Sequence, residues 1–107
     1  MQNQMLNKTE IEFAGKEAFV LKLYITGMSE NSVRAIQNIK KFCDQYLKDN
    51  FDLEIIDIYK DPSAAEEQKI VFSPSLIRQF PLPKKILIGD LSDTKKVIVG
   101  LGITFKE

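Results

Sequence analysis

The sequence predicts a single α/β domain whose elements follow the order βαβαββα. Two observations predict it. A nearly continuous apolar and β-branched run at 18–26 precedes a stretch with helical apolar spacing and then a second apolar run at 51–58, which is the pattern of a right-handed parallel βαβ unit. The chain has 107 residues, of which 44% are hydrophobic, and this is the size of one compact domain.

The first half of the chain has clear local signals. Residues 1–16 are polar without a sustained period, which predicts a flexible N-terminal arm, or a short extra strand at 11–13, ahead of a single domain at 17–107. The run at 18–26 suits a central strand with helices on both faces. Ser29 is a suitable N-cap for a helix that continues to about residue 48. Its apolar stripe is expected to comprise Val33, Ile36, Ile39 or Lys40, Cys43 and Leu47.

The second half is expected to close the sheet. Asp61 and Pro62 predict the start of a short helix over 63–69, because aspartate can cap free amides and proline at the first position loses no needed hydrogen bond. Two further runs, 76–80 and 84–88, are separated by a proline-rich turn and predict an antiparallel strand pair. Lys84 and Lys85 would form a charged strand edge that discourages aggregation.

The last segment supports two interpretations. Val97, Ile98 and Leu101 have helical spacing, and Ser92 or Asp93 could cap a helix. The β-branched residues at 97–99 and 103–104 favour a strand instead, and Gly100 and Gly102 each lower helix stability by about 1 kcal/mol relative to alanine. Such a conflict between local and global preference is typical of two packings of similar free energy.

Composition excludes several classes of function. Lysine plus arginine equals aspartate plus glutamate at 15 each, so no overall field would recruit nucleic acid or an anionic membrane. No run approaches the roughly 18 apolar residues of a membrane span, and no signal peptide opens the chain, so a cytoplasmic location is expected. With one cysteine and no histidine, the chain lacks the residues that the usual zinc sites and any histidine-based catalytic triad need. We therefore expect no metal and no cofactor.

The turn at 27–32 joins the first strand to the first helix. In a thioredoxin-like chain a redox Cys-x-x-Cys pair would lie here, and this chain has no cysteine at the turn. Pro74 is the kind of proline that faces this turn in that fold, and we expect the Ser73–Pro74 bond to be cis. A scaffold kept without its thiols favours a binding surface over an enzyme.

Ordered blocks over about 18–105 closely resemble the KaiB family: VLKLY at 20–24, NSVRA at 31–35, ID at 56–57, AEE at 65–67, KI at 69–70, Pro74, GDLS at 89–92 and KV at 96–97. The resemblance implies a small clock-type protein that binds the ring ATPase KaiC. Its thioredoxin-like form would be similar to the N-terminal sensor domain of the kinase SasA. It also implies self-association, as a tetramer or dimer, in a ground-state fold of order βαββααβ that forms when the C-terminal half rearranges.

The resemblance and the surface chemistry together suggest candidate residues. The partner-binding set, from the second strand, the second helix and the basic strand edge, is Phe51, Asp52, Glu54, Lys60, Lys69, Lys84 and Lys85. Gly89 and Asp90 are expected to control the change of fold, because glycine permits positive φ and aspartate can bond to local amides. Where KaiB proteins of cyanobacterial type tend to carry an aromatic, a small residue and a lysine, this chain has Phe51, Asp52 and Glu54. That charge reversal is unfavourable for a KaiA-like third component.

The sequence therefore predicts a non-enzymatic regulator that binds a KaiC-like ATPase and modulates its phosphorylation or ATPase state. A SasA-like sensor or adaptor domain is one alternative. The other is a thiol oxidoreductase using Cys43, although the core spacing of this residue favours a small buried hydrophobe. Glu66 and Glu67 are adjacent, so they do not share a helix face and are not expected to act as an acid/base pair.

Overall fold

The order of elements in the computed structural model matches the predicted order βαβαββα. The structure describes residues 18–70 and 73–104, so the predicted arm and its alternative, a short strand at 11–13, lie outside the described residues. The elements are β1 (Phe19–Ile25), α2 (Glu30–Phe42), a π-helical segment η1 (Cys43–Leu47), β2 (Phe51–Asp57), α3 (Pro62–Glu67), β3 (Ser75–Phe80), β4 (Lys85–Ile88) and α4 (Thr94–Leu101). The division of the chain into an arm and a domain at residue 17 stays a prediction.

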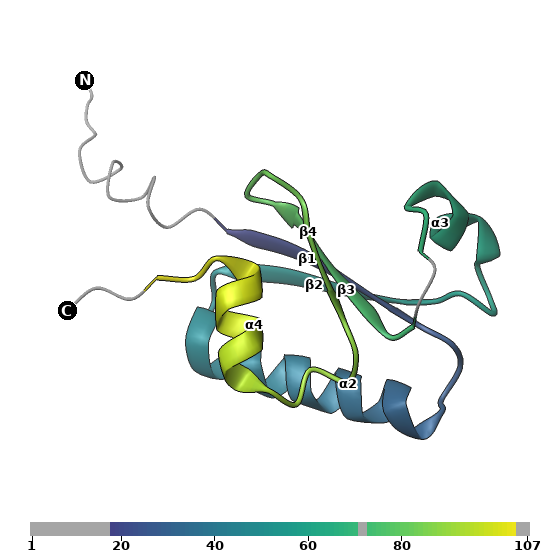
Figure 1. The fold of residues 1–107 in the computed structure, drawn as a ribbon, viewed down its shortest axis with the longest axis horizontal. Coiled ribbons are helices and arrows are strands. Elements are labelled where there is room, and N and C mark those ends of the chain that lie inside the picture. The colour runs from purple at the N-terminus through teal and green to yellow at the C-terminus, as the bar shows by residue number, and fades with distance from the viewer. Residues whose placement is uncertain (1–17, 71–72, 105–107) are drawn as a thin grey trace.

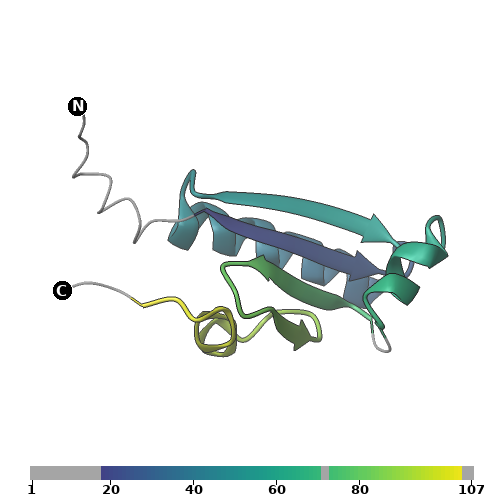
Figure 2. The same cartoon turned by 90° about the horizontal axis from the view of Figure 1, so that it is seen from above.

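The sheet has four strands in the order β2-β1-β3-β4. β1 and β2 are parallel, with Phe19 opposite Phe51 and Ile25 opposite Asp57, and α2 connects them, as the sequence predicts. β3 runs antiparallel to both β1 and β4. Figure 2 shows the strands side by side with β2 and β4 at opposite edges. This order separates residues that the sequence places in one candidate surface.

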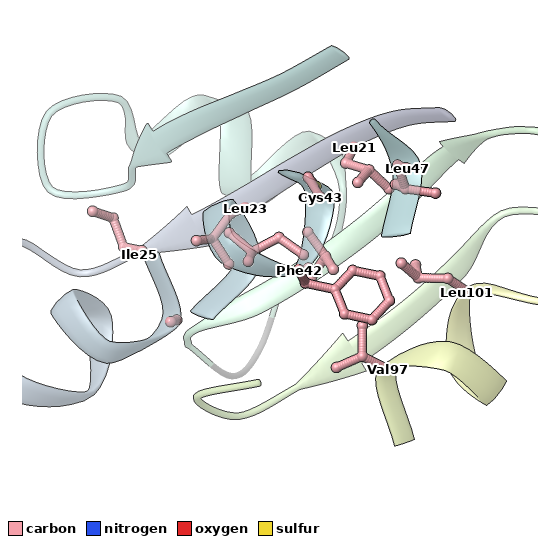
Figure 3. Packing of buried hydrophobic residues seen from close by; sticks show 11 residues of the cluster. Leu21, Leu23, Ile25, Phe42, Cys43, Leu47, Val97 and Leu101 are labelled. Carbon is pink, nitrogen blue, oxygen red and sulfur yellow. The ribbon is translucent and has the colours of Figure 1, made fainter. Parts of the chain in front are cut away.

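One face of the sheet carries the core. Figure 1 shows α2 and α4 on the same side of the sheet, whereas α3 lies toward the other side at one end. Leu21 and Leu23 are fully buried against α2 and α4, and Figure 3 shows Phe42 of α2 next to Val97 of α4 in this core. Lys22 points to the opposite face, with its Nζ 3.9 Å from Glu54 Oε1. The expectation of helices over both faces of β1 is therefore correct only in part.

The first helical segment begins and ends close to where it was predicted, but its last part is π-helical. Ser29 is its N-cap, and its Oγ accepts a hydrogen bond from the Ser32 amide at 3.2 Å. The α-helix stops at Phe42 and continues as the π-helical η1, after which Lys48 takes a left-handed φ of 53°. The buried stripe is Ser32, Ala35, Ile39, Phe42, Cys43 and Leu47, so the placement of Val33 in the stripe was wrong.

The short helix α3 is smaller than predicted. Pro62 occupies its first turn as expected, but the helix ends at Glu67. The expectation that Asp61 caps the helix was wrong, because its side chain makes no capping bond and instead accepts from the Ser63 hydroxyl at 3.0 Å. Glu66 and Glu67 are exposed.

The last segment forms a helix, and its glycines explain the conflicting signals. Asp93 caps α4 by accepting from the Lys96 amide at 3.3 Å. A Cβ at Gly100 would lie 2.1 Å from Leu87 Cδ2, so the absence of a side chain lets α4 approach β4. Gly102 ends the helix with φ 70° in the left-handed region. Both glycines thus have a place in the helical arrangement.

Candidate functional site

The turn after β1 is held by one carboxylate from the neighbouring strand. Asp57 Oδ1 accepts hydrogen bonds from the backbone amides of Gly27 and Tyr59, each at 3.0 Å. The Gly27 amide, then the Tyr59 amide, and then the charge of Lys60 hold the pKa of Asp57 below its usual value. Gly27 lies in the turn after β1, where its φ is 61°, and Tyr59 follows the end of β2. The hydrogen bonds of Asp57 therefore fix two loops at the carboxyl ends of parallel strands.

Two serines occupy the start of α2 with the spacing of a Cys-x-x-Cys pair. The Ser29 hydroxyl donates to Ser32 Oγ at 3.0 Å, and Ser32 Oγ accepts from the Thr26 amide at 3.3 Å. Ser32 is fully buried. A hydroxyl pair at a helix N-terminus can order the turn through hydrogen bonds, but it has none of the thiolate nucleophilicity that this position provides in redox proteins.

Pro74 connects this region with the C-terminal half. The Ser73–Pro74 peptide bond is cis, as predicted. Pro74 is buried and its carbonyl accepts from the Gly89 amide at 2.9 Å. The Ser73 hydroxyl donates to the carbonyl of Tyr24 in β1 at 3.4 Å. The two residues just before β3 are therefore tied to the central strand and to the turn that follows β4.

Cys43 does not have the properties of a catalytic thiol. It is completely buried, and burial, followed by the nearby Asp44 carboxylate, raises its pKa to about 12. The nucleophilic form is the thiolate, which is negligible at neutral pH for such a thiol. Within the described ranges, 18–70 and 73–104, no histidine, cysteine, aspartate and glutamate side chains form a group of three or more that could hold a metal ion.

The turn between β4 and α4 is fastened to α2 by Asp90. Its Oδ2 lies 3.2 Å from Arg34 Nε, its carbonyl accepts from Asn38 Nδ2 at 2.8 Å, and its Oδ1 accepts from the Ser92 amide at 3.1 Å. The Ser92 hydroxyl and amide, and then Arg34, keep the pKa of Asp90 below its usual value. Gly89 has a φ of 118°, which favours glycine. The predicted properties of both residues are therefore present.

A hollow of about 200 Å³ lies beside this turn. Residues 87–93 line it together with Lys96 and Val97 of α4. The turn therefore does not pack tightly against the start of α4. The contacts of Asp90 attach it to α2 across 52 and 56 positions of the sequence, and the Gly89 amide attaches it to Pro74.

The structure divides the predicted partner-binding set between two edges. Asp52 and Glu54 are exposed on β2, whereas Lys84 and Lys85 are exposed at β4, the opposite edge. Phe51 is half-buried and packs against the core, so it offers little surface.

Three of the predicted lysines lie nearer to α3 than to β2 in the chain. Lys60 and Lys69 flank α3 in sequence and are exposed. The Lys84 Nζ donates to Gln68 Oε1 at 3.0 Å, which links the turn before β4 to the end of α3. The predicted partner-binding residues thus form two clusters, an acidic one on β2 and a basic one around α3 and β4. The sequence had suggested a single surface.

Some exposed residues near the turn were missed by the sequence argument. Met28 and Tyr59 are 73% and 74% exposed, and the Tyr59 ring lies beside Gly27, where a Cβ would be 3.2 Å from its Cδ2. Exposed aromatic and methionine side chains are frequent anchors of protein interfaces. A tyrosine directly after a strand was the available signal. The roles of Arg34 and Asn38 had no signal beyond their spacing of four residues on a helix.

The KaiB domain model matches residues 22–103, which is most of the chain. The chain belongs to the KaiB family. It is 50% identical over 84 residues to the circadian clock protein KaiB3 of Synechocystis sp., covering 78% of this chain and 82% of that protein. It is 42% identical over 92 residues to the circadian clock oscillator protein KaiB of Trichodesmium erythraeum, covering 86% and 88%. These relatives are named as clock proteins and not as enzymes.

Solved structures show which fold this KaiB-family chain adopts. The N-terminal domain of Synechococcus elongatus SasA superposes with a TM-score of 0.68 at 19% identity, covering 100% of this chain and 96% of that one. Mitochondrial thioredoxin 3 of Saccharomyces cerevisiae superposes with a TM-score of 0.64 at 14% identity, covering 90% and 89%. The predicted thioredoxin-like fold is confirmed. Among the described residues, none of the helices combines the length and apolar character needed to cross a bilayer.

Proposed function

We propose that this chain is a non-enzymatic regulatory protein that binds a KaiC-like ring ATPase and modulates its phosphorylation or ATPase state. The observation that carries the proposal is the combination of KaiB-family sequence with a thioredoxin-like fold in which serines occupy the start of α2. Such a chain keeps the scaffold and lacks an accessible thiol. These features support regulation by binding over thiol chemistry.

We further propose that a change of fold in the C-terminal half controls this binding. The terminal helix α4 has eight residues and contains three consecutive β-branched residues, Val97, Ile98 and Val99, which disfavour a helix. The turn before it contains Gly89 and is fastened at Asp90. These features support an alternative arrangement, βαββααβ, of similar free energy.

A fold equilibrium has a measurable consequence for binding. If only the thioredoxin-like form binds the ATPase, the apparent affinity falls in proportion to the fraction in that form. Self-association of the alternative form, as a tetramer or dimer, would lower that fraction further by mass action. The expected location is cytoplasmic, and neither nucleic acid nor membrane is an expected partner.

The test is to mix the purified chain with the KaiC-type ATPase of the same organism and nucleotide, and to follow the complex by size exclusion over a day. Two charge-reversal variants locate the contact, because the structure places their residues at opposite edges: Asp52→Lys with Glu54→Lys on β2, and Lys84→Glu with Lys85→Glu at β4. Loss of binding in one variant alone identifies the edge. No complex with the unaltered chain would refute the proposal.

A SasA-like adaptor is the second candidate, favoured by the superposition on the SasA domain. The two candidates differ in their kinetics. A fold-switching protein associates with a slow phase whose rate is independent of ATPase concentration at saturation, whereas a rigid adaptor associates in a single phase that is linear in concentration. Stopped-flow fluorescence over a hundredfold range of ATPase concentration distinguishes them.

The oxidoreductase alternative depends on Cys43 alone. Because this thiol is buried and its pKa is raised to about 12, we expect it to react with a disulfide reagent only after the chain unfolds. A titration at pH 7 with and without denaturant measures this. Rapid reaction of the Cys43 thiol with the reagent in the native protein would support the oxidoreductase hypothesis.

A further inference from the structure

A buried arginine fastens the end of α4 to the sheet. Arg78 of β3 is only 5% exposed and is on the face of the sheet covered by α4. Its Nη1 donates to the carbonyl of Leu101 at 2.5 Å, and its Nη2 donates to the carbonyl of Pro83 at 2.6 Å. Three segments meet at this guanidinium: β3, the turn before β4, and the last residue of α4.

The charge of Arg78 is balanced in an unusual way. In the part of the chain that the structure describes, no carboxylate pairs with it, and its Nε has no hydrogen-bond partner. Its cross-strand neighbour Lys85 is another cation on the same face. A buried charge needs compensation, and here it comes from the carbonyl of Pro83 and from the carbonyl end of α4, which carries partial negative charge when the helix is formed.

The surrounding glycines keep this contact open. A Cβ at Gly102 would lie 2.9 Å from Arg78 Nη1, so the side chain reaches the helix end through space that glycine leaves free. Gly100 allows α4 to approach Leu87 at the same time. The position of α4 and the burial of Arg78 therefore depend on each other.

The ion pair that attaches this region to α2 is more exposed. The side chains of Arg34 and Asp90 are 45% and 27% exposed, so water and salt screen their attraction. Arg78 is almost entirely removed from water, where hydrogen bonds to a charged group are stronger. Of these two polar contacts, Arg78 is thus the stronger candidate for control of α4, beside the core packing of Val97 and Leu101.

We propose that Arg78 is the catch that holds α4 on the sheet and so maintains the thioredoxin-like arrangement of the C-terminal half. When α4 leaves, Arg78 loses the Leu101 carbonyl and the cover of the helix and becomes hydrated, and these events occur together. The link of this catch to ATPase binding rests on the proposed function. The catch itself is a property of the free protein.

Hydrogen exchange of the free, full-length chain tests the catch. Arg78→Met keeps an unbranched apolar stem and removes all donors and the charge. We expect the amides at 98–102 to exchange at least tenfold faster, while those of Leu21 and Leu23 in β1 change less than twofold. Arg34→Met is the matched control at the Asp90 contact, and we expect it to change the amides at 98–102 less than threefold.

Three outcomes would overturn the catch: unchanged exchange in α4, equal acceleration in α4 and β1, or an equal effect of the control. If Arg78→Met does not fold, Arg78→Lys replaces it, because lysine keeps the charge but its single ammonium cannot occupy both guanidinium positions. It should show a smaller acceleration confined to the same amides, and acceleration throughout the chain would overturn the catch.

A second arm separates the catch from the proposed function. If the unaltered chain binds the ATPase, Arg78→Met should weaken the complex and Arg34→Met should weaken it less. Faster opening of α4 with unchanged binding would overturn the link between the catch and binding. If the unaltered chain forms no complex, the proposed function fails, and the exchange data still decide whether Arg78 holds α4.

Discussion

Replacing Gly100 by alanine tests how closely α4 packs on the sheet. In an unconstrained helix this change would increase stability by about 1 kcal/mol, because glycine loses more backbone entropy on folding. In this structure the new Cβ would lie 2.1 Å from Leu87 Cδ2 and 2.9 Å from Leu87 Cγ. Favourable carbon contacts require roughly 3.5–4.0 Å, so Leu87 or α4 must move.

The overlap should outweigh the gain in helix propensity. Overpacking a close contact costs about 1–3 kcal/mol, and the propensity gain offsets about 1 kcal/mol of it. We therefore expect Gly100→Ala to lower the free energy of unfolding by about 1 kcal/mol. In a domain of this size that corresponds to a decrease in Tm of about 4–8 °C. Urea denaturation followed by circular dichroism measures the change.

Two controls identify the cause. In a Leu87→Ala background the obstructing methyl groups are absent, so Gly100→Ala should become stabilising, with a coupling energy of about 1–2 kcal/mol in a double-mutant cycle. Val99→Ala alters the same helix at a position that is 78% exposed and should be neutral or slightly stabilising. If Gly100→Ala alone stabilises the protein by about 1 kcal/mol, α4 does not pack against Leu87 as described.

Two further predictions concern the loops at the ends of β1 and β4. The pKa values of Asp57 and Asp90 are lower in the folded chain than the ordinary 3.8, so the stability that these two carboxylates contribute is complete above the unfolded pKa and is lost as pH falls through the folded pKa. Urea unfolding between pH 6 and 2 should show this loss of stability, and Asp57→Asn should make the loss smaller. An unchanged dependence of stability on acid pH in that variant would contradict the prediction. Because the hydroxyls of Ser29 and Ser32 are 3.0 Å apart, the double variant Ser29→Cys with Ser32→Cys should form an intramolecular disulfide under mild oxidation, detected as a 2 Da mass loss. The control Glu30→Cys with Ser32→Cys should form no disulfide, because positions two apart do not face each other on a helix. Two free thiols in the first variant would refute the prediction.

Local signals predicted most of the elements. Ser29 was identified as an N-cap, and the structure places its Oγ on the Ser32 amide, because capping depends only on residues three positions apart. The parallel pairing of β1 and β2 followed from two apolar runs joined by a helix. The π-helical end of α2 and the missing cap at Asp61 were not predictable, because a difference of one hydrogen bond decides them.

Part of the candidate site was predictable and part was not. The cis bond at Pro74 was expected from the place of this proline in a thioredoxin-like fold, and the positive φ of Gly89 was expected from residue type. The contact between Asp90 and Arg34 joins residues 56 positions apart, and no local sequence pattern predicts it. The division of the partner-binding residues between β2 and β4 depends on strand order, which the sequence does not specify.

The sequence by itself determined the family of this protein, the order of its elements as far as β4 and the absence of a thiol at the start of α2. Only the tertiary structure decided whether the last segment is a helix. Its local preferences differ by about 1 kcal/mol per residue or less, so they leave helix and strand close in free energy. The space that Gly100 leaves beside Leu87, and the carbonyl that Leu101 offers to Arg78, exist only when α4 lies on the sheet. These contacts favour the helix.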